Sequence, residues 1–166
     1  DAICDKLVKD CGWRPSVDIK NPDIQLNLFI HDRNGILSFD TSGQSLHKRR
    51  YREETVEAPM QETLAAALLK FANYRGDEVF YDPCLGSGTL LIEAALIASK
   101  TPPGFFRKNW GFFNLPQYRE EEWLKIKNQA DQLKTPLVKG KFFGTDSNRQ
   151  AVHAAKVNAR AAGFHQ

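Results

Sequence analysis

The stretch Val79-Phe80-Tyr81-Asp82-Pro83-Cys84-Leu85-Gly86-Ser87-Gly88-Thr89 decides the fold of this chain. A short β-prone apolar run ends at an acid and a proline, passes through two glycines, and leads into the helix-forming series Leu90-Leu91-Ile92-Glu93-Ala94-Ala95. This pattern predicts a strand, a tight turn and a helix. Because glycines let backbone N–H groups approach a ligand and a helix start has unpaired donors, the turn suits a small anionic or carboxylate-bearing molecule.

A second strand-then-helix unit follows later in the chain. Lys141-Phe142-Phe143-Gly144-Thr145-Asp146 predicts a short strand ending in a carboxylate, and residues 147–162 predict a helix with Ser147 or Asp146 as its cap and Gly163 as its stop. Two such units predict a parallel, doubly wound α/β sheet with its ligand crevice at the carboxyl ends of the strands. We therefore expect Asp82 and Asp146 on the same rim.

Other periodicities predict the remaining elements. Residues 1–11 read as the end of an amphipathic helix stopped by Gly12, and residues 23–40 as a hairpin whose Asn34-Gly35 pair takes the positive φ of the turn. A helix is expected from Ala58-Pro59 to about residue 74, another to about residue 99, and a third over residues 119–133. That third helix is expected to face inward with Trp123, Ile126, Ala130 and Leu133.

Composition limits the function only loosely. The 166 residues, 42% of them hydrophobic, suffice for one domain with a core or for one domain and part of another, and the net charge of +3 is only weakly basic. Three cysteines without a C-x-x-C pair favour reduced thiols in a cytoplasmic protein and suggest no metal site. No apolar run approaches the roughly 20 residues of a membrane-spanning helix. The start at Asp1 leads us to expect a piece of a longer protein.

Two segments combine cations with aromatic rings. His47-Lys48-Arg49-Arg50-Tyr51-Arg52 has the residue types that contact phosphates and stack on bases in RNA-binding surfaces, although such a run is also typical of a solvated connector. Residues 105–118 are rich in aromatics around Arg107 and Lys108, which indicates either a platform for bases or, more commonly, a satellite core.

The two expected carboxylates favour one cofactor class over another. Asp146 is suited to both hydroxyls of a ribose, and Asp82 either to an ammonium group or to holding the turn in shape. This pair fits S-adenosylmethionine better than a dinucleotide. The G-x-G-x-x-G pattern of dinucleotide sites would require glycine at position 91, which is Leu91.

The string Asp82-Pro83-Cys84-Leu85-Gly86-Ser87-Gly88-Thr89 resembles the Asp-Pro-x-x-Gly-Ser-Gly-Thr motif of class I S-adenosylmethionine-dependent RNA methyltransferases that carry a THUMP domain. Residues 40–49 resemble the junction leaving the THUMP domain, and residues 58–65 resemble the helix entering the catalytic domain. The likeness is greatest to bacterial 23S ribosomal RNA guanine-N2 methyltransferases and covers essentially the whole chain.

This resemblance implies a division of the chain and a set of site residues. Residues 1–46 would be the C-terminal part of an RNA-binding THUMP domain, 47–57 a basic linker, and 58–166 the first half of a Rossmann-like methyltransferase domain. The partner would be ribosomal RNA, contacted by residues 47–52, without membrane or metal. S-adenosylmethionine would be bound by Pro59, Thr63, Asp82, Pro83, Gly86, Ser87, Gly88, Thr89, Asp146 and Ser147.

Two departures and one missing motif qualify the resemblance. Arg50 stands where the family commonly has glycine, and Leu85 rather than cysteine directly precedes the first glycine of the turn. The base-holding Asn/Asp-Pro-Pro-aromatic loop of the family is not among the 166 residues, so no catalytic residue is assigned and the fragment alone is expected to be inactive. The alternatives are a transfer RNA guanine-N2 methyltransferase, a non-catalytic RNA-binding module and an NAD-dependent oxidoreductase.

Overall fold

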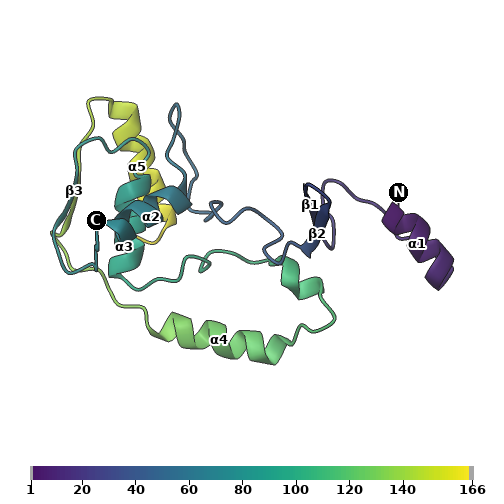
Figure 1. Cartoon of the computed structure of the whole chain (residues 1–166). Coiled ribbons are helices and arrows are strands. Elements are labelled where there is room, and N and C mark those ends of the chain that lie inside the picture. Colours follow the sequence, from purple (N-terminus) through teal and green to yellow (C-terminus); the bar gives the residue numbers. More distant parts are fainter. Residues whose placement is uncertain (1, 165–166) are drawn as a thin grey trace.

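A computed structural model describes residues 2–164 of the chain, which form a sequence of short elements joined by long loops (Figure 1). In chain order the elements are α1 (Ala2–Cys11), β1 (Leu26–His31), β2 (Asn34–Phe39), α2 (Glu62–Phe71), β3 (Phe80–Asp82), α3 (Thr89–Ala98), the 3-10 helix η1 (Gly111–Asn114), α4 (Glu120–Gln132), β4 (Phe142–Gly144) and α5 (Arg149–Ala161).

The two strand-then-helix units are present and pair as expected. β3 and β4 are parallel, with Phe80 opposite Phe142 and Asp82 opposite Gly144. Helix α3 packs on both strands and lies against α2 and α5. Because α3 is apolar on nearly all sides and helix-forming in composition, it takes the central position, with six of its ten residues buried. The architecture is α/β, and the carboxyl ends of β3 and β4 meet at one edge.

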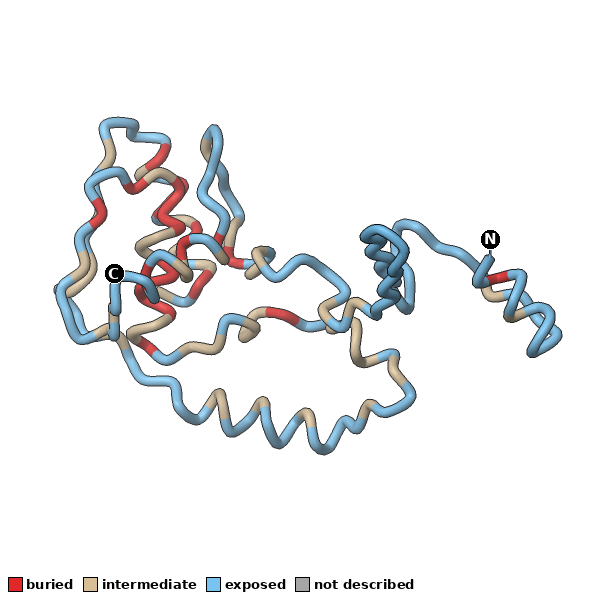
Figure 2. Tube along the Cα trace, viewed as in Figure 1, coloured by how far each residue is buried: buried red, intermediate tan, exposed pale blue. Residues whose placement is uncertain are grey.

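The main core forms where residues 47–57, which we call the basic segment, meet α3 and α5. Tyr51, Ile92, Leu96 and Ala162 make up its buried cluster, and Figure 2 shows the buried residues concentrated around α3 and α5. Tyr51 is only 1% exposed. The segment around it, expected to be part of a linker over residues 47–57, instead packs into the half of the chain that contains α2, α3 and α5.

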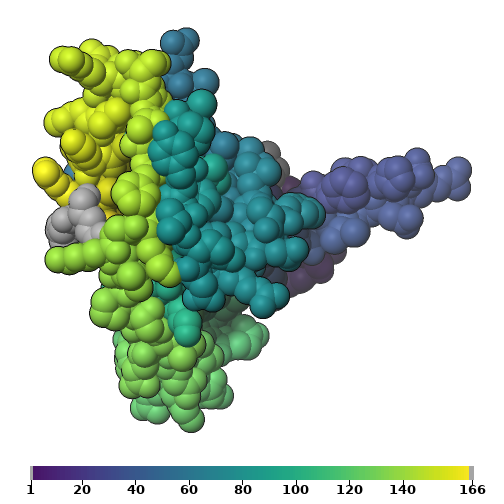
Figure 3. All heavy atoms as spheres, turned by 90° about the vertical axis from the view of Figure 1, so that its left-hand side faces the viewer, coloured from purple at the N-terminus to yellow at the C-terminus, as the bar shows by residue number. Residues whose placement is uncertain are grey.

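The hairpin β1–β2 and helix α1 stand apart from that half (Figures 1 and 3). The strands pair in an antiparallel ladder from Leu26 opposite Phe39 to His31 opposite Asn34. The turn is therefore the Asp32-Arg33 pair. Asp32 takes the left-handed φ of 52°, so the prediction that Asn34-Gly35 would do so is wrong. A short polar side chain such as aspartate tolerates this conformation well.

Two helix starts differ from the expected positions, and one helix stop agrees with its expected position. Helix α2 begins at Glu62 rather than at Ala58-Pro59, because Ala58 has a φ of 49° and Gln61 is extended. The cap of α5 is Asn148, whose side-chain oxygen accepts from the Gln150 N–H at 2.9 Å, and not Ser147 or Asp146. Gly163 adopts a left-handed φ as expected of a helix stop.

The aromatic residues after α3 form a satellite core rather than an open platform. Rings of Trp110, Phe112, Phe113, Tyr118 and Trp123 lie 4.8 to 6.0 Å apart in tilted or edge-on pairs. Helix α4 joins this cluster through Trp123.

The rest of α4 is open. Ala130 is half-buried, while Ile126 and Leu133 are 60% and 65% exposed, so their predicted inward orientation is wrong. The reason is that α4 packs on no other α-helix or strand within residues 2–164, and meets its neighbours mainly through Trp123, which contacts the rings of Phe112 and Phe113 in η1. None of the helices that residues 2–164 form is long and apolar enough to cross a membrane.

Candidate cofactor site

The glycine turn joins β3 to α3 and is fastened to the chain after β4. The Leu85 N–H donates to the Thr145 carbonyl at 2.9 Å, and the Thr145 N–H donates to the Asp82 carbonyl at 2.9 Å. The Gly86 N–H donates to Asp146 Oδ2 at 2.8 Å. Parallel pairing thus continues as a set of cross-links that hold the turn at the carboxyl edge of the sheet.

The two glycines of the turn have different physical reasons to lack a side chain. Both adopt positive φ, 52° at Gly86 and 83° at Gly88. A Cβ on Gly88 would lie 3.0 Å from the Ala155 Cβ and 3.2 Å from its Cα, so this glycine lets the turn pack closely on α5. A Cβ on Gly86 would meet only Val56, at 4.0 Å. Gly86 therefore presents open backbone to its surroundings.

The two acids at this edge differ in their surroundings. Asp82 ends β3, is 6% exposed, and accepts from the Cys84 N–H at 3.1 Å. Asp146 lies two residues beyond the end of β4 and is half-buried, and its carboxylate accepts from the N–H groups of Asn148 and Gly86. These two backbone hydrogen bonds, from Asn148 first, lower the pKa of Asp146. Both carboxylates occupy the same rim.

A groove of about 360 Å³ opens between the glycine turn and the loop before α2. Its walls are Val56, Glu57, Ala58, Pro59 and Met60 on one side and Asp82, Cys84, Leu85, Gly86, Ser87, Thr89 and Leu90 on the other. The walls thus include five of the ten expected cofactor residues: Pro59, Asp82, Gly86, Ser87 and Thr89. Of the other five, Gly88 packs on α5 and Asp146 bonds to the turn, while Thr63, Pro83 and Ser147 are not part of the walls.

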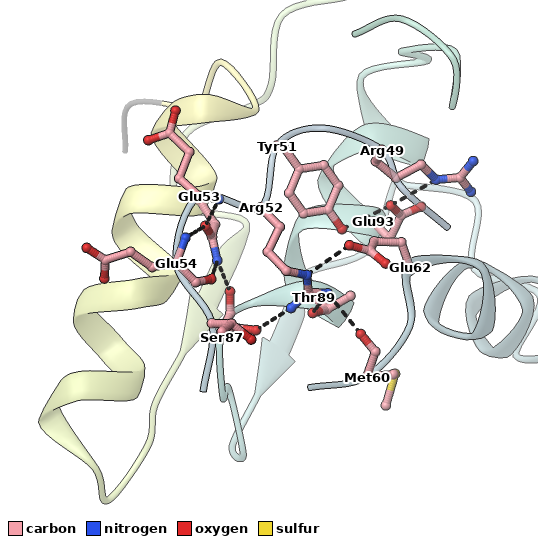
Figure 4. Close-up of polar contacts among 12 residues, drawn as sticks. Arg49, Tyr51, Arg52, Glu53, Glu54, Met60, Glu62, Ser87, Thr89 and Glu93 are labelled. Carbon is pink, nitrogen blue, oxygen red and sulfur yellow. Dashed lines mark hydrogen bonds and ion pairs between the residues drawn. The ribbon is translucent and has the colours of Figure 1, made fainter. Parts of the chain in front are cut away.

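Arg52 joins the two walls of this groove (Figure 4). Its guanidinium donates to Ser87 Oγ at 2.8 Å, to Thr89 Oγ1 at 2.9 Å and to the Met60 carbonyl at 2.9 Å. Its Nε pairs with Glu62 Oε1 at 2.9 Å. The buried hydroxyls of the turn are thus directed at an arginine of the protein itself, and Arg52 holds the loop before α2 against the turn.

Glu93 anchors the rest of the basic segment to α3. Its Oε1 accepts from the Tyr51 hydroxyl at 3.1 Å and lies 3.5 Å from Arg49 Nε. Burial raises the pKa of Glu93, and burial likewise raises the pKa of Tyr51. The sequence did carry a signal for this contact, because a lone acid in an otherwise apolar helix requires a buried cationic or hydroxyl partner.

Asn158 supports the same structure from α5. This residue is fully buried, and its Oδ1 accepts from the N–H groups of Glu53 and Glu54 at 2.8 and 2.9 Å. Its Nδ2 donates to the carbonyls of Glu54 and Ser87 at 2.8 and 3.0 Å. Asn158 thereby fixes both the basic segment and the glycine turn. Its position on an alanine-rich helix face was the only signal in the sequence.

The six residues expected to contact RNA are therefore not equivalent. Tyr51 lies in the core and cannot stack on a base in this arrangement, while Arg49 and Arg52 are paired with buried acids. Lys48 and Arg50 are exposed, and His47 is half-buried. Arg50 has a φ of 74°, which means that the arginine departing from the family pattern keeps the backbone conformation that glycine adopts readily. Within residues 2–164, no three His, Cys, Asp or Glu side chains are grouped to hold a metal.

Comparison with known families divides the chain in two. The family described as "RMKL-like, methyltransferase domain" matches residues 49–166, and the THUMP domain family matches residues 1–40. Among curated proteins, "Ribosomal RNA large subunit methyltransferase K/L" of Syntrophotalea carbinolica is 44% identical over 171 residues, and its namesake in Vibrio campbellii is 40% identical over 169 residues. The chain is covered almost entirely in both cases but spans only 24% of each relative.

Three solved structures are also similar to this chain. SMU.472, crystallised as a complex with SAH, superposes with a TM-score of 0.80 at 33% identity, over 99% of this chain and 43% of that one. A protein of Clostridium difficile 630 described as a possible methylase gives a TM-score of 0.83 at 32% identity, with the same coverage. A third, from Listeria monocytogenes and named a predicted N6-adenine-specific DNA methylase, gives 0.75 at 36% identity over 85% of this chain and 37% of that one.

Proposed function

The chain belongs to the family of THUMP-containing, RMKL-like methyltransferases, and from this membership we propose that its full-length protein methylates a guanine N2 in 23S ribosomal RNA. S-adenosylmethionine is the methyl donor, in keeping with the SAH complex of the similar structure. The names of the curated relatives support a large-subunit ribosomal RNA as the substrate. We further propose that residues 1–46 are THUMP-derived and that the methyltransferase unit begins within the basic segment, which packs into its core.

One observation carries the cofactor assignment: an open groove lies beside a glycine turn whose backbone is held by Asp146. Each oxygen of that carboxylate accepts one backbone N–H, at Gly86 and at Asn148, and so keeps a lone pair for a ribose hydroxyl. Gly86 lines the groove with no Cβ between its backbone and a ligand, while its N–H is bonded to Asp146. We propose that Asp146 binds the ribose while the turn and Asp82 face the methionine part.

In this arrangement the protein accelerates methyl transfer mainly by positioning. The groove fixes the cofactor, and the RNA-binding parts bring the guanine amine into line with the sulfonium methyl group, where near-attack geometry supplies most of the rate. The amine loses its proton during or after transfer. Thr101-Pro102-Pro103-Gly104, which shares two prolines with the base-holding motif, follows the end of α3 and acts as its terminator.

The cofactor proposal is tested by titrating the full-length protein with labelled S-adenosylmethionine. Asp146→Ala and Gly86→Val should each weaken binding by about tenfold or more, because one removes the ribose acceptor and the other places a branched side chain at the open, left-handed turn residue. Asp131→Ala is the matched control, since the Asp131 carboxylate pairs with Lys127 on α4, and Asp131 does not line the groove. Unchanged affinity in the double variant of Asp146 and Gly86 would contradict the assignment.

The substrate proposal needs a separate readout. The full-length protein is incubated with methyl-labelled cofactor and, in separate reactions, with 23S ribosomal RNA or transfer RNA, and each RNA is digested to nucleosides. We expect the label in N2-methylguanosine. Label in N6-methyladenosine would favour adenine N6 as the target, the position that the Listeria neighbour's name gives for DNA, and label only on transfer RNA would favour a transfer RNA enzyme. Cofactor binding without methyl transfer to either RNA would favour a non-catalytic RNA-binding module. A melting temperature that rises with NAD and not with S-adenosylmethionine would favour an oxidoreductase.

A further inference from the structure

A second cavity, of about 680 Å³, lies beside the cofactor groove and shares Pro59 and Met60 with it. We call it the junction pocket. It is lined by residues of the basic segment, of the polar turn before it and of the start of α2: Gln44, His47, Lys48, Arg49, Arg50, Arg52, Pro59, Met60, Gln61 and Glu62. No residue assigned to cofactor binding contributes to it except Pro59.

The charges of this pocket are not balanced by the protein. Arg52 is paired with Glu62, and Arg49 with Glu93 behind it. Lys48 and Arg50 are exposed, and neither has an acidic partner among residues 2–164. The hydrogen bond that Arg50 makes is to the neutral Gln44 Oε1, at 3.2 Å. The pocket therefore retains two cations that are available to an anion.

The backbone at Arg50 adopts a conformation that is unfavourable for arginine. Its φ of 74° is left-handed, a conformation that strains a residue with a Cβ and that glycine would adopt without cost. Such strain persists where the surrounding structure enforces it, commonly at ligand-binding positions. Arg50 also lowers the pKa of nearby Arg107, after the larger effect of burial, which agrees with a positive potential around the pocket.

We propose that the junction pocket binds a backbone phosphate of the substrate RNA through Lys48 and Arg50. A guanidinium and an ammonium are the side chains that hold phosphate oxygens most strongly, and such contacts set the register of a nucleic acid on its protein. The pocket and the cofactor groove share a wall, and Arg52 fastens that wall to the glycine turn. A phosphate bound here would place the neighbouring nucleotide beside the methyl donor. The proposal rests on the RNA methyltransferase function above.

Arg50→Gly is the decisive variant, because it removes the cation and relieves the backbone strain together. In the full-length protein we expect its affinity for 23S ribosomal RNA to fall about tenfold at fixed salt. The slope of log Kd against log salt concentration should fall by about 0.7, the value for one lost contact to a single strand. The melting temperature should stay equal or rise, and the affinity for S-adenosylmethionine should not change.

Two further variants make the outcome unambiguous. Arg75→Gly removes the same charge from an exposed turn outside the pocket and should leave affinity and slope close to wild type. Lys48→Ala should lower the RNA affinity and the salt slope in the same way, and it leaves the left-handed residue 50 unchanged. Wild-type affinity and slope in both pocket variants, or an equal loss in Arg75→Gly, would overturn the proposal. A wild-type protein that leaves 23S ribosomal RNA unmethylated contradicts the proposed function instead, and the pocket is then decided by the salt slope alone.

Discussion

Individual carboxylates near the groove show how surroundings, rather than residue type, set the charge behaviour of this site. Burial raises the pKa of Glu93, whereas backbone hydrogen bonds from Asn148 and Gly86 lower that of Asp146. Glu93 faces Tyr51 and Arg49 inside the core, while Asp146 is half-buried at the sheet edge. One acid thus holds the structure together and the other remains ionised to face a ligand.

The shift at Asp146 predicts a pH dependence of stability. Because its folded pKa is below the ordinary value of 3.8, its stabilising contribution is complete above that value and is lost as the pH falls through the lowered pKa. Between about pH 5 and about pH 3, the unfolding free energy of the wild-type protein should therefore fall more steeply than that of Asp146→Asn. Denaturant unfolding at several pH values measures this. Parallel curves for the two proteins would contradict it, since Glu93 is common to both and its opposite effect cancels.

At the scale of elements, the glycine turn depends on contacts from three directions. The chain after β4 bonds to it through Thr145 and Asp146, and α5 packs on Gly88 through Ala155. The basic segment bonds to it through Arg52. Asn158 of α5 links the basic segment to the turn, since its side chain bonds both to residues 53–54 and to the Ser87 carbonyl. The groove keeps its shape because these elements are fastened to each other and not only to the sheet.

Replacing Asn158 therefore tests whether α5 supports the turn. Asn158→Ala leaves two N–H groups and two carbonyls without their partner and opens a space at a fully buried position, and we expect a loss of about 2–4 kcal/mol in unfolding free energy. The affinity for S-adenosylmethionine should fall as well, because Ser87 loses an anchor. Asn128→Ala on the exposed face of α4 is the control and should stay within about 0.5 kcal/mol of wild type. Similar losses in the two variants would mean that the Asn158 contacts do not govern stability.

At the scale of the whole molecule, the hairpin part and the methyltransferase part are joined by a small set of contacts. Buried Arg107 donates to the carbonyls of Ser42 and Gln44 and lies 4.6 Å from the Trp110 ring centroid. The Phe112 N–H donates to the Thr41 carbonyl at 2.9 Å. The satellite aromatic core thus holds the end of the hairpin segment, directly before the basic segment that leads to the junction pocket. This order places the part that matches the THUMP domain family shortly before the segment that we propose contacts RNA.

Cysteine accessibility offers a test of ligand position in the intact protein. Cys84 and Cys11 are both exposed, but Cys84 lines the cofactor groove whereas Cys11 ends the distant helix α1 (Figure 1). SAH at 100 times its Kd should slow alkylation of Cys84 by at least about tenfold and leave Cys11 unaffected, with peptide mass spectrometry as the measurement. Equal rates at Cys84 with and without SAH would place the cofactor elsewhere.

The sequence by itself determined the two strand-then-helix units, their parallel pairing, the glycine turn with Asp82 and Asp146 at one edge, and the family. These follow from local chemistry: β-prone runs, glycine at left-handed turn positions, and apolar helical periodicity. The sequence also indicated the satellite aromatic core. It misplaced the hairpin turn and the starts of two helices, because capping and turn geometry depend on which neighbouring residue takes the unusual φ.

The role of the basic segment, by contrast, depends on contacts between residues that are far apart in the sequence. A run of cations with one tyrosine has the same sequence pattern whether the fold leaves it exposed to solvent or buries it. Here the hydrogen-bond partners are distant in the sequence. Arg52 bonds to Ser87 across 35 positions, Tyr51 to Glu93 across 42, and Glu53 to Asn158 across 105. Such partners cannot be deduced from local pattern, because burying a charge or an amide is favourable only where packing supplies the matching group. The fold thus enclosed three of the six residues and left Lys48 and Arg50 exposed to a ligand.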